Sequence, residues 1–280
     1  MAVDECAALL DNVLPWLQTW LQMPMLQGVA VTTTFWACVL FLVWRSPLSL
    51  AFKQQGADRM MSICHTTVST CLGVFTEWCA VPGCSEGHSW VRGPLMIMLG
   101  YIVVDFVSML VTDVWKGWRP VDRSMLLHHS VIICMFGVSA AYDVGVYFAS
   151  SLLINEASTL NLTAMWYLTY SGRKSTKLFA INGVIFAIMF FLCRIVFIPV
   201  SFYQFTLANM CYPGDGVDGG SMLVQGPHLM VVGYIFIFLL NLVWFRKLAK
   251  GALKMFRGSK AVSEMKEGLL ATEGVTVTAL

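Results

Sequence analysis

Charged side chains are scarce in this sequence. Asp, Glu, Lys and Arg make up only 12% of its 280 residues, while 58% are apolar and the mean hydropathy is +0.71. A water-soluble domain of this length could not bury so many apolar side chains in one core. The apolar runs also lack the alternation of apolar and polar residues that is typical of membrane β-strands. The composition therefore predicts an all-α, polytopic membrane protein.

Seven apolar stretches are long enough to cross ~30 Å of hydrocarbon at ~1.5 Å per residue. We predict that each forms one transmembrane helix. The predicted spans are residues 27–45, 60–81, 94–115, 124–142, 145–170, 177–205 and 226–248.

Basic residues are absent from the first 26 positions and concentrated between alternate spans. Sixteen of the eighteen Lys and Arg residues fall in segments 45–59, 116–123, 171–177 and 246–280. By the positive-inside rule this side is cytosolic, so the N-terminus is lumenal or extracellular and the C-terminus cytosolic. We expect the membrane of the endoplasmic reticulum, with the plasma membrane as the alternative.

The two ends of the chain are expected to lie outside the main bundle. Residues 1–26 have no basic n-region and predict an interfacial lumenal segment, not a cleavable signal peptide. Residues 27–45 are expected to form a peripheral first span. The tail, residues 251–280, is polar and expected to be disordered, and Thr278–Leu280 has the spacing of a PDZ-domain ligand. The basic tail favours anionic lipid headgroups as partners over nucleic acid.

Cysteines are mostly intramembrane. Four of the nine lie at or near the predicted lumenal side, where an oxidising compartment permits one disulfide whose pairing the sequence leaves open. They are Cys6, Cys79, Cys84 and Cys211.

Three histidines lie near the cytosolic ends of two predicted spans: His65 in the second, and His128 and His129 in the fourth. Asp113 and Asn161 approach the same depth from neighbouring spans. Histidine exchanges protons near neutral pH, so the three histidines are candidate catalytic residues. The alternative is a set of packing histidines bonded to nearby hydroxyls. Adjacent histidines point ~100° apart on a helix, which disfavours a metal site, and we expect no metal or resident cofactor.

A second polar layer is expected near the middle of the bilayer, where Asp105, Glu156 and Arg194 meet. An unpaired charge there costs ~2.5–3.5 kcal/mol on insertion scales. Pairing Arg194 with one acid leaves the other protonated, hydrogen-bonded or titratable. These three, with Asp113 and Asn161, are candidate substrate-binding residues, and the alternative is a buried pair that only fixes helix register.

Short motifs in the spans carry a family resemblance. They are Arg59–His65, Gly100–Asp105, Leu127–His129, Glu156–Thr159 with Trp166, and Ile181–Gly183 with Arg194. In this combination, over residues 50–250, the sequence resembles the TLC-domain family, which includes the ceramide synthases and translocating-chain-associating membrane protein.

The resemblance implies that spans two to seven form a six-helix barrel-like bundle around a lipid-accessible cavity, with span one outside. In ceramide synthases the paired histidines are implicated in N-acyl transfer from acyl-CoA, a role that would fall here on His128 and His129. Ceramide synthases carry a further His-Asp motif where this chain has Asn155-Glu156. That departure speaks against ceramide synthesis.

Two classes of function follow from these observations. One is an enzyme of membrane lipid homeostasis that transfers an acyl group from acyl-CoA, as co-substrate, to a lipid acceptor. The other is a non-catalytic protein that binds or organises lipids, or escorts cargo through its cytosolic tail.

Overall fold

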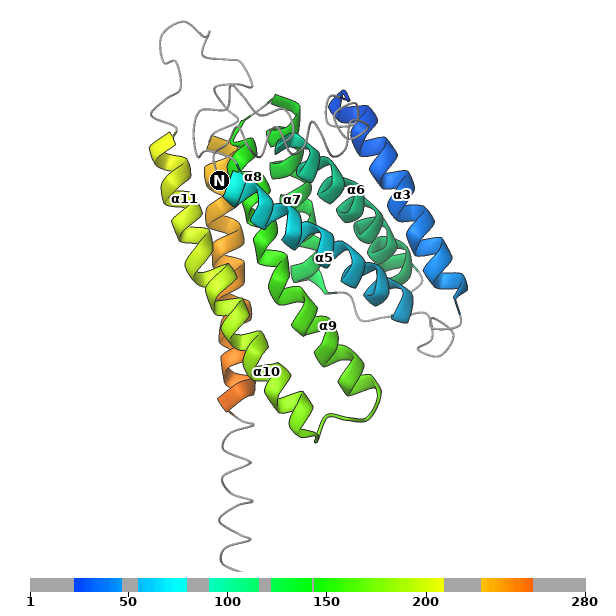
Figure 1. The fold of residues 1–280 in the computed structure, drawn as a ribbon. Coiled ribbons are helices and arrows are strands. Elements are labelled where there is room, and N and C mark those ends of the chain that lie inside the picture. Colours follow the sequence, from blue (N-terminus) through cyan, green and yellow to red (C-terminus); the bar gives the residue numbers. More distant parts are fainter. Residues whose placement is uncertain are drawn as a thin grey trace, which may run out of the picture.

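The fold is described from a computed structural model of the chain (Figure 1), for residues 23–46, 55–79, 91–115, 122–142, 144–208 and 228–253. Within these ranges all regular structure is helical, as the composition predicts. The predictions for residues 1–22, for the tail beyond 253 and for Thr278–Leu280 concern residues outside those described.

The described helices form seven continuous rods, and each rod overlaps one predicted span. Three rods change helical type along their length, to a 3₁₀-helix (η3) or a π-helix (η2, η4). In chain order the elements are α3 (Met25–Arg45), α5 (Gln55–Cys79), α6 (Arg92–Met109), η2 (Leu110–Trp115), α7 (Arg123–Tyr142), α8 (Val146–Ser151), η3 (Leu152–Glu156), α9 (Ala157–Tyr170), α10 (Lys177–Phe190), η4 (Phe191–Val196), α11 (Phe197–Ala208) and the final helix His228–Leu253.

Five of the seven rods are individually long and apolar enough to cross a membrane. The other two are α5 and the rod formed by α8, η3 and α9. Helix α5 buries a polar stripe that includes Ser62, His65 and Ser69, whereas Ile63 and Val68 on its opposite side are exposed. Because a polar stripe is stable in a membrane only against protein or water, α5 depends on its neighbours for its place in the bundle.

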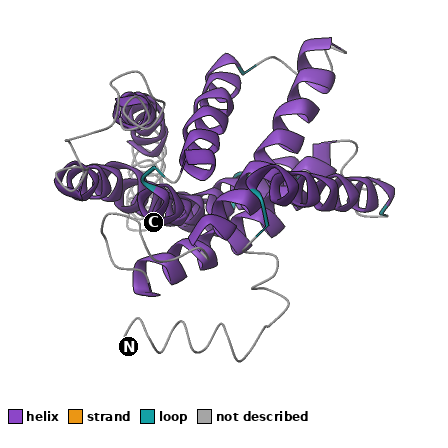
Figure 2. Cartoon of the chain, turned by 90° about the horizontal axis from the view of Figure 1, so that it is seen from above, coloured by secondary structure: helices purple, strands orange, loops and turns teal. Residues whose placement is uncertain are grey.

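Six rods close a ring. Helix α5 packs on α6, α6 on α7, α10 on α9, and α9 on α5. The final helix completes the circuit, because Trp244 donates a hydrogen bond to Ser124 of α7 and Asn241 accepts one from Arg194 of η4. Helix α3 packs on α6 and α5 from outside the ring (Figure 1). Figure 2 shows the described elements from above, all of them helices joined by loops. This arrangement confirms the predicted six-helix bundle with a peripheral first span; the lipid-accessible cavity stays a prediction.

Helix α3 is docked more closely than a simple anchor. The Thr32 hydroxyl donates to the Met96 carbonyl at 2.7 Å, and Trp36 Nε1 donates to the Ile97 carbonyl at 3.2 Å. A Cβ added to Gly100 would lie 2.6 Å from the Thr32 carbonyl carbon, so only glycine permits this approach of the two backbones. The contact fixes α3 against α6 at one height.

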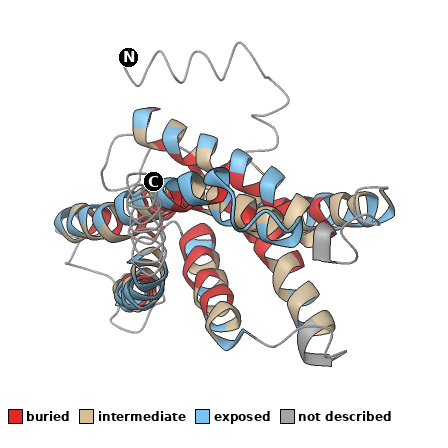
Figure 3. Ribbon diagram, turned by 90° about the horizontal axis from the view of Figure 1, so that it is seen from below, coloured by how far each residue is buried: buried red, intermediate tan, exposed pale blue. Residues whose placement is uncertain are grey.

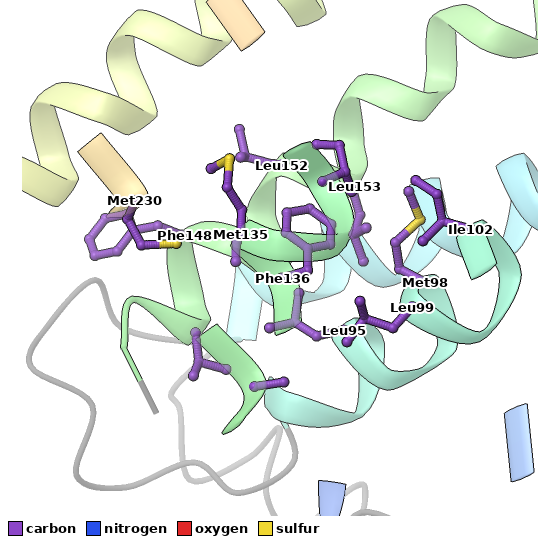
Figure 4. Packing of buried hydrophobic residues seen from close by; sticks show 14 of the residues in the cluster. Leu95, Met98, Leu99, Ile102, Met135, Phe136, Phe148, Leu152, Leu153 and Met230 are labelled. Atoms are coloured by element: carbon purple, nitrogen blue, oxygen red, sulfur yellow. The ribbon is translucent and has the colours of Figure 1, made fainter. Parts of the chain in front are cut away.

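An apolar core fills the predicted lumenal half of the ring. All six residues of α8 are buried, and α8 contacts α5, α6, α7 and α11. Figure 3 shows that buried residues face the interior of the bundle and exposed ones face outward. The core residues labelled in Figure 4 come from α6, α7, α8, η3 and the final helix: Leu95, Met98, Leu99, Ile102, Met135, Phe136, Phe148, Leu152, Leu153 and Met230.

Helix α5 ends at Cys79, which is disulfide-bonded. Its partner is not among the cysteines of the described residues that are free, namely Cys38, Cys64, Cys71, Cys134 and Cys193. Cys79 is one of the four cysteines placed by the sequence near the lumenal side.

Candidate functional site

Asp122 caps the N-terminus of α7, the helix that carries His128 and His129. The Asp122 carboxylate accepts hydrogen bonds from the backbone amides of Ser124 and Met125 at 3.0 and 3.3 Å, and from the Ser124 hydroxyl at 2.6 Å. Partial burial opposes ionisation, but these hydrogen bonds prevail and hold the pKa of Asp122 below its usual value. The charged cap stabilises the helix N-terminus, which places His128 and His129 just over one turn inside the helix.

His129 is held at both ring nitrogens. Nδ1 lies 2.8 Å from the Met125 carbonyl oxygen and Nε2 lies 2.8 Å from Asp105 Oδ2. A carbonyl only accepts, so Nδ1 carries a proton and donates it. The second contact then needs one further proton, which sits on His129 as an ion pair with Asp105 or on the Asp105 carboxyl. His129 and Asp105 are therefore a coupled pair with no free ring nitrogen.

His128 is buried but keeps hydrogen-bonding capacity. Its Nδ1 is shielded from solvent and has no hydrogen-bond partner. Its ring meets the His129 ring edge to face at 5.7 Å and the Trp244 ring at 5.3 Å. Trp244 is itself fixed, because its Nε1 donates to the Ser124 hydroxyl at 3.2 Å. The ring of His128 is thus positioned by its neighbours, and its buried Nδ1 keeps an unused hydrogen-bonding capacity.

His65 lies in a separate aromatic environment. Its ring stacks on Tyr101 with 3.4 Å between centroids, and Trp36 of α3 meets it edge-on at 5.8 Å. Its Nε2 lies 2.8 Å from the Ser69 hydroxyl and 2.9 Å from the Met98 sulfur. The hydrogen bonds and ring contacts of His65 described here are with α3, α6 and its own helix, and His129 lies within electrostatic interaction range of it.

Arg194 and Glu156 form the second pair. Arg194 Nη2 lies 3.6 Å from Glu156 Oε1, and its Nε, Nη1 and Nη2 donate to Ser158, Asn241 and Thr159 at 2.9, 3.4 and 3.1 Å. The other carboxylate oxygen, Oε2, accepts from Thr159. Arg194 is thus compensated by one acid, Glu156, and Asp105 is left to His129, as one of the predicted pairings requires.

The two pairs belong to one electrostatic cluster, since Glu156 lies within interaction range of His129, and Arg194 within range of His128. Arg194 lies in the π-helical segment η4, and Glu156 ends the 3₁₀ segment η3. Single π-turns inside α-helices occur frequently at functional sites. The charged residues therefore lie where the backbone departs from the α-helix.

Of the remaining predicted site residues, Asn161 is engaged between two helices and Asp113 is not placed. The Asn161 side chain donates to Asn182 Oδ1 at 3.0 Å, and the Asn182 side chain donates to the Asn161 carbonyl at 2.9 Å. This pair joins α9 to α10 and has a structural explanation. Asp113 lies within η2, but its side chain is outside the described residues.

Three residues that complete the site were not predicted as site residues from the sequence: Trp244, Ser158 and Asn241. Asn241 is fully buried and is the only amide in the final span, a signal that could have identified it. Trp244 had no comparable signal, because tryptophan near a span end ordinarily marks the membrane interface.

Comparison with known proteins matches the TLC domain over residues 55–250. TLC domain-containing protein 4-A of Xenopus laevis and TLC domain-containing protein 4 of Xenopus tropicalis are each 31% identical over 60% of this chain, which spans 62% of their length. TLC domain-containing protein 4 of Homo sapiens is 23% identical over 79% of this chain and 85% of its own. No solved structure matches the chain. The matched region includes every described residue of the site, and the chain belongs to the TLC-domain family.

Proposed function

We propose that this membrane protein transfers the acyl group of an acyl-CoA to a lipid acceptor, with His128 as the general base. The observation that carries the proposal is the buried Nδ1 of His128, which has no hydrogen-bond partner while the adjacent His129 is fully engaged. Membership of the TLC-domain family points more broadly to a membrane lipid-related function.

The reaction balances with the residues present. An unprotonated ring nitrogen of His128 takes the proton of the acceptor's O–H or N–H group as that oxygen or nitrogen attacks the thioester carbonyl. The C–S bond breaks, and the imidazolium returns the proton to the departing thiolate, giving an acylated lipid and free CoA. His129 and Asp105 are positioning residues, since the ring of His129 packs edge to face on that of His128.

The test measures the transfer of radiolabelled oleate from oleoyl-CoA to lipid by the full chain in lipid nanodiscs. His128→Ala should lower the rate ~10²-fold or more, the usual contribution of a general base. Ser130→Ala is the matched control, because the Ser130 hydroxyl bonds only to the Leu126 carbonyl of its own helix. Full transfer by a folded His128→Ala protein refutes the mechanism.

A non-catalytic lipid-binding role is the second candidate. It is favoured by the hydrogen bonds that all three guanidinium nitrogens of Arg194 make, which fit a rigid recognition site as well as a reactive one. This role predicts that lipid binds and that His128→Ala weakens it, with no release of CoA from any acyl-CoA.

We further propose that the C-terminus faces the cytosol and the membrane is that of the endoplasmic reticulum. Two features support this orientation: Cys79 is disulfide-bonded at one end of the bundle, and the basic turn at Arg173 and Lys174 lies at the other (Figure 1). Cysteine accessibility to a membrane-impermeant reagent tests it in sealed microsomes. A cysteine placed at Lys174 should react without permeabilisation.

A further inference from the structure

The described charges of the cluster beside His128 are already balanced. Arg194 faces Glu156, and Asp105 shares a proton with His129. Whichever member of the Asp105–His129 pair holds the proton, the side chains of Arg194, Glu156, Asp105 and His129 together carry no net charge. A ligand that reaches this cluster therefore meets neither an unpaired cation nor an unpaired anion.

The groups left without partners are almost all uncharged. Among the described residues, eight buried side-chain nitrogen or oxygen atoms have no hydrogen-bond partner, and none belongs to Arg or Lys. Seven come from Thr, Ser, Asn and His side chains. The exception is Glu77, which lies near the end of α5 at Cys79, whereas His128 lies near the start of α7 at the opposite end of the bundle.

From this balance we infer that the lipid group received at His128 is an uncharged hydroxyl, not a carboxylate, a phosphate or an ammonium. A hydroxyl donates one hydrogen bond and accepts others, so it satisfies His128 Nδ1 without bringing charge into the bundle. A carboxylate or an ammonium would remain uncompensated, and buried charge without a partner is strongly unfavourable.

This inference rests on the proposed function only for the role of His128. It specifies the class of acyl acceptor: a neutral lipid alcohol. The same chemistry could come from a diacylglycerol or a sterol, and the experiment separates the two.

The experiment measures binding of four probes to the full chain in phosphatidylcholine nanodiscs at pH 7.4: dioleoylglycerol, cholesterol, oleate and sphinganine. At least one of the two alcohols should bind ~10-fold or more tightly than oleate and sphinganine, which is about 1.4 kcal/mol. His128→Ala should remove that preference, and Ser130→Ala should keep it. Oleate or sphinganine binding as tightly as both alcohols, or no binding of any probe, overturns the inference.

A second variant tests the charge balance itself. Glu156→Gln leaves Arg194 as an uncompensated cation, while Gln can still accept the hydrogen bond from Thr159. Oleate should therefore gain ~10-fold in relative affinity and sphinganine should not. An unchanged preference in a folded Glu156→Gln protein contradicts the argument.

Failure of the proposed function can be told apart in the same preparation. If oleate from oleoyl-CoA reaches no acceptor while the alcohol preference stands, acyl transfer fails and the inference holds. If oleate is transferred to sphinganine only, acyl transfer holds and the inference is wrong.

Discussion

Replacing Gly100 by alanine tests how α3 is held. The new Cβ would lie 2.6 Å from the Thr32 carbonyl carbon, a backbone atom that cannot rotate away. Since carbon atoms in ordinary contact lie ~3.5–4 Å apart, α3 must move out by about 1 Å. Overpacking of this kind costs ~1–3 kcal/mol. The shift also weakens two hydrogen bonds from α3 to α6, each worth ~0.6 kcal/mol between membrane helices.

Alanine is a better helix former than glycine by ~1 kcal/mol, which offsets part of the cost. We therefore expect a net loss of ~1–3 kcal/mol for Gly100→Ala, from the overpacking and hydrogen-bond terms less the propensity term. The control is Gly137→Ala on α7, where a new Cβ meets nothing within 4 Å and only the propensity gain remains. Equilibrium unfolding in mixed micelles, followed by tryptophan fluorescence, measures both. If Gly100→Ala proves as stable as Gly137→Ala, α3 is not docked as described.

Two further predictions concern the ends of helices and their register. Asn161→Ala and Asn182→Ala should each lower the free energy of unfolding of the bundle by ~0.6–1.7 kcal/mol. The double variant should lose less than the sum, because each side chain bonds to the other residue. Strictly additive losses in micelle unfolding would argue against the pair. Asp122→Ala should cost ~0.5–1 kcal/mol and speed amide exchange in the first turn of α7, whereas Asp122→Asn keeps a good cap. Since the pKa of Asp122 is lowered in the fold, its contribution is full above the unfolded value of 3.8 and is lost as the pH falls below it; a loss of protection between pH 6 and 8 would contradict the assignment.

The length and position of the rods could be read from the sequence because the membrane imposes both. Apolar runs of bilayer length end at basic or polar loops, and all seven predicted spans overlap observed rods. The division of the fifth span into α8, η3 and α9 was not predicted, since no Pro or Gly marks the change between residues 146 and 170. That rod is a 3₁₀-helix where it packs closely on α5: a Cβ on Gly73 would lie 2.6 Å from the Ile154 backbone nitrogen.

The candidate site was only partly predictable because residue number gives depth in the membrane and says little about rotation around the helix axis. His65 has the depth of His128 and His129, yet α5 turns it toward Trp36 and Tyr101. The predicted depth also placed Arg194 near both Asp105 and Glu156, and it did not indicate which of the two acids pairs with the arginine. The choice depends on the 3₁₀ and π segments, which rotate Glu156 and Arg194 relative to an ideal α-helix.

The structural and functional interpretations of these polar residues can be separated residue by residue. A side chain that serves only the fold should have its hydrogen bonds completed by the fold, because an unsatisfied polar atom inside a membrane protein costs stability. His65, Asn161 and Arg194 have described partners, and none of their side-chain atoms is among the buried atoms without one. His128 does not: its Nδ1 is buried without a partner, although the helix cap, Trp244 and His129 fix its ring in place. Seven other buried atoms of the described residues also lack partners, but His128 is the only imidazole among these eight side chains. A side chain that is held in place with an unused hydrogen-bonding atom can receive a partner that arrives with a substrate, and the proposal therefore rests on His128.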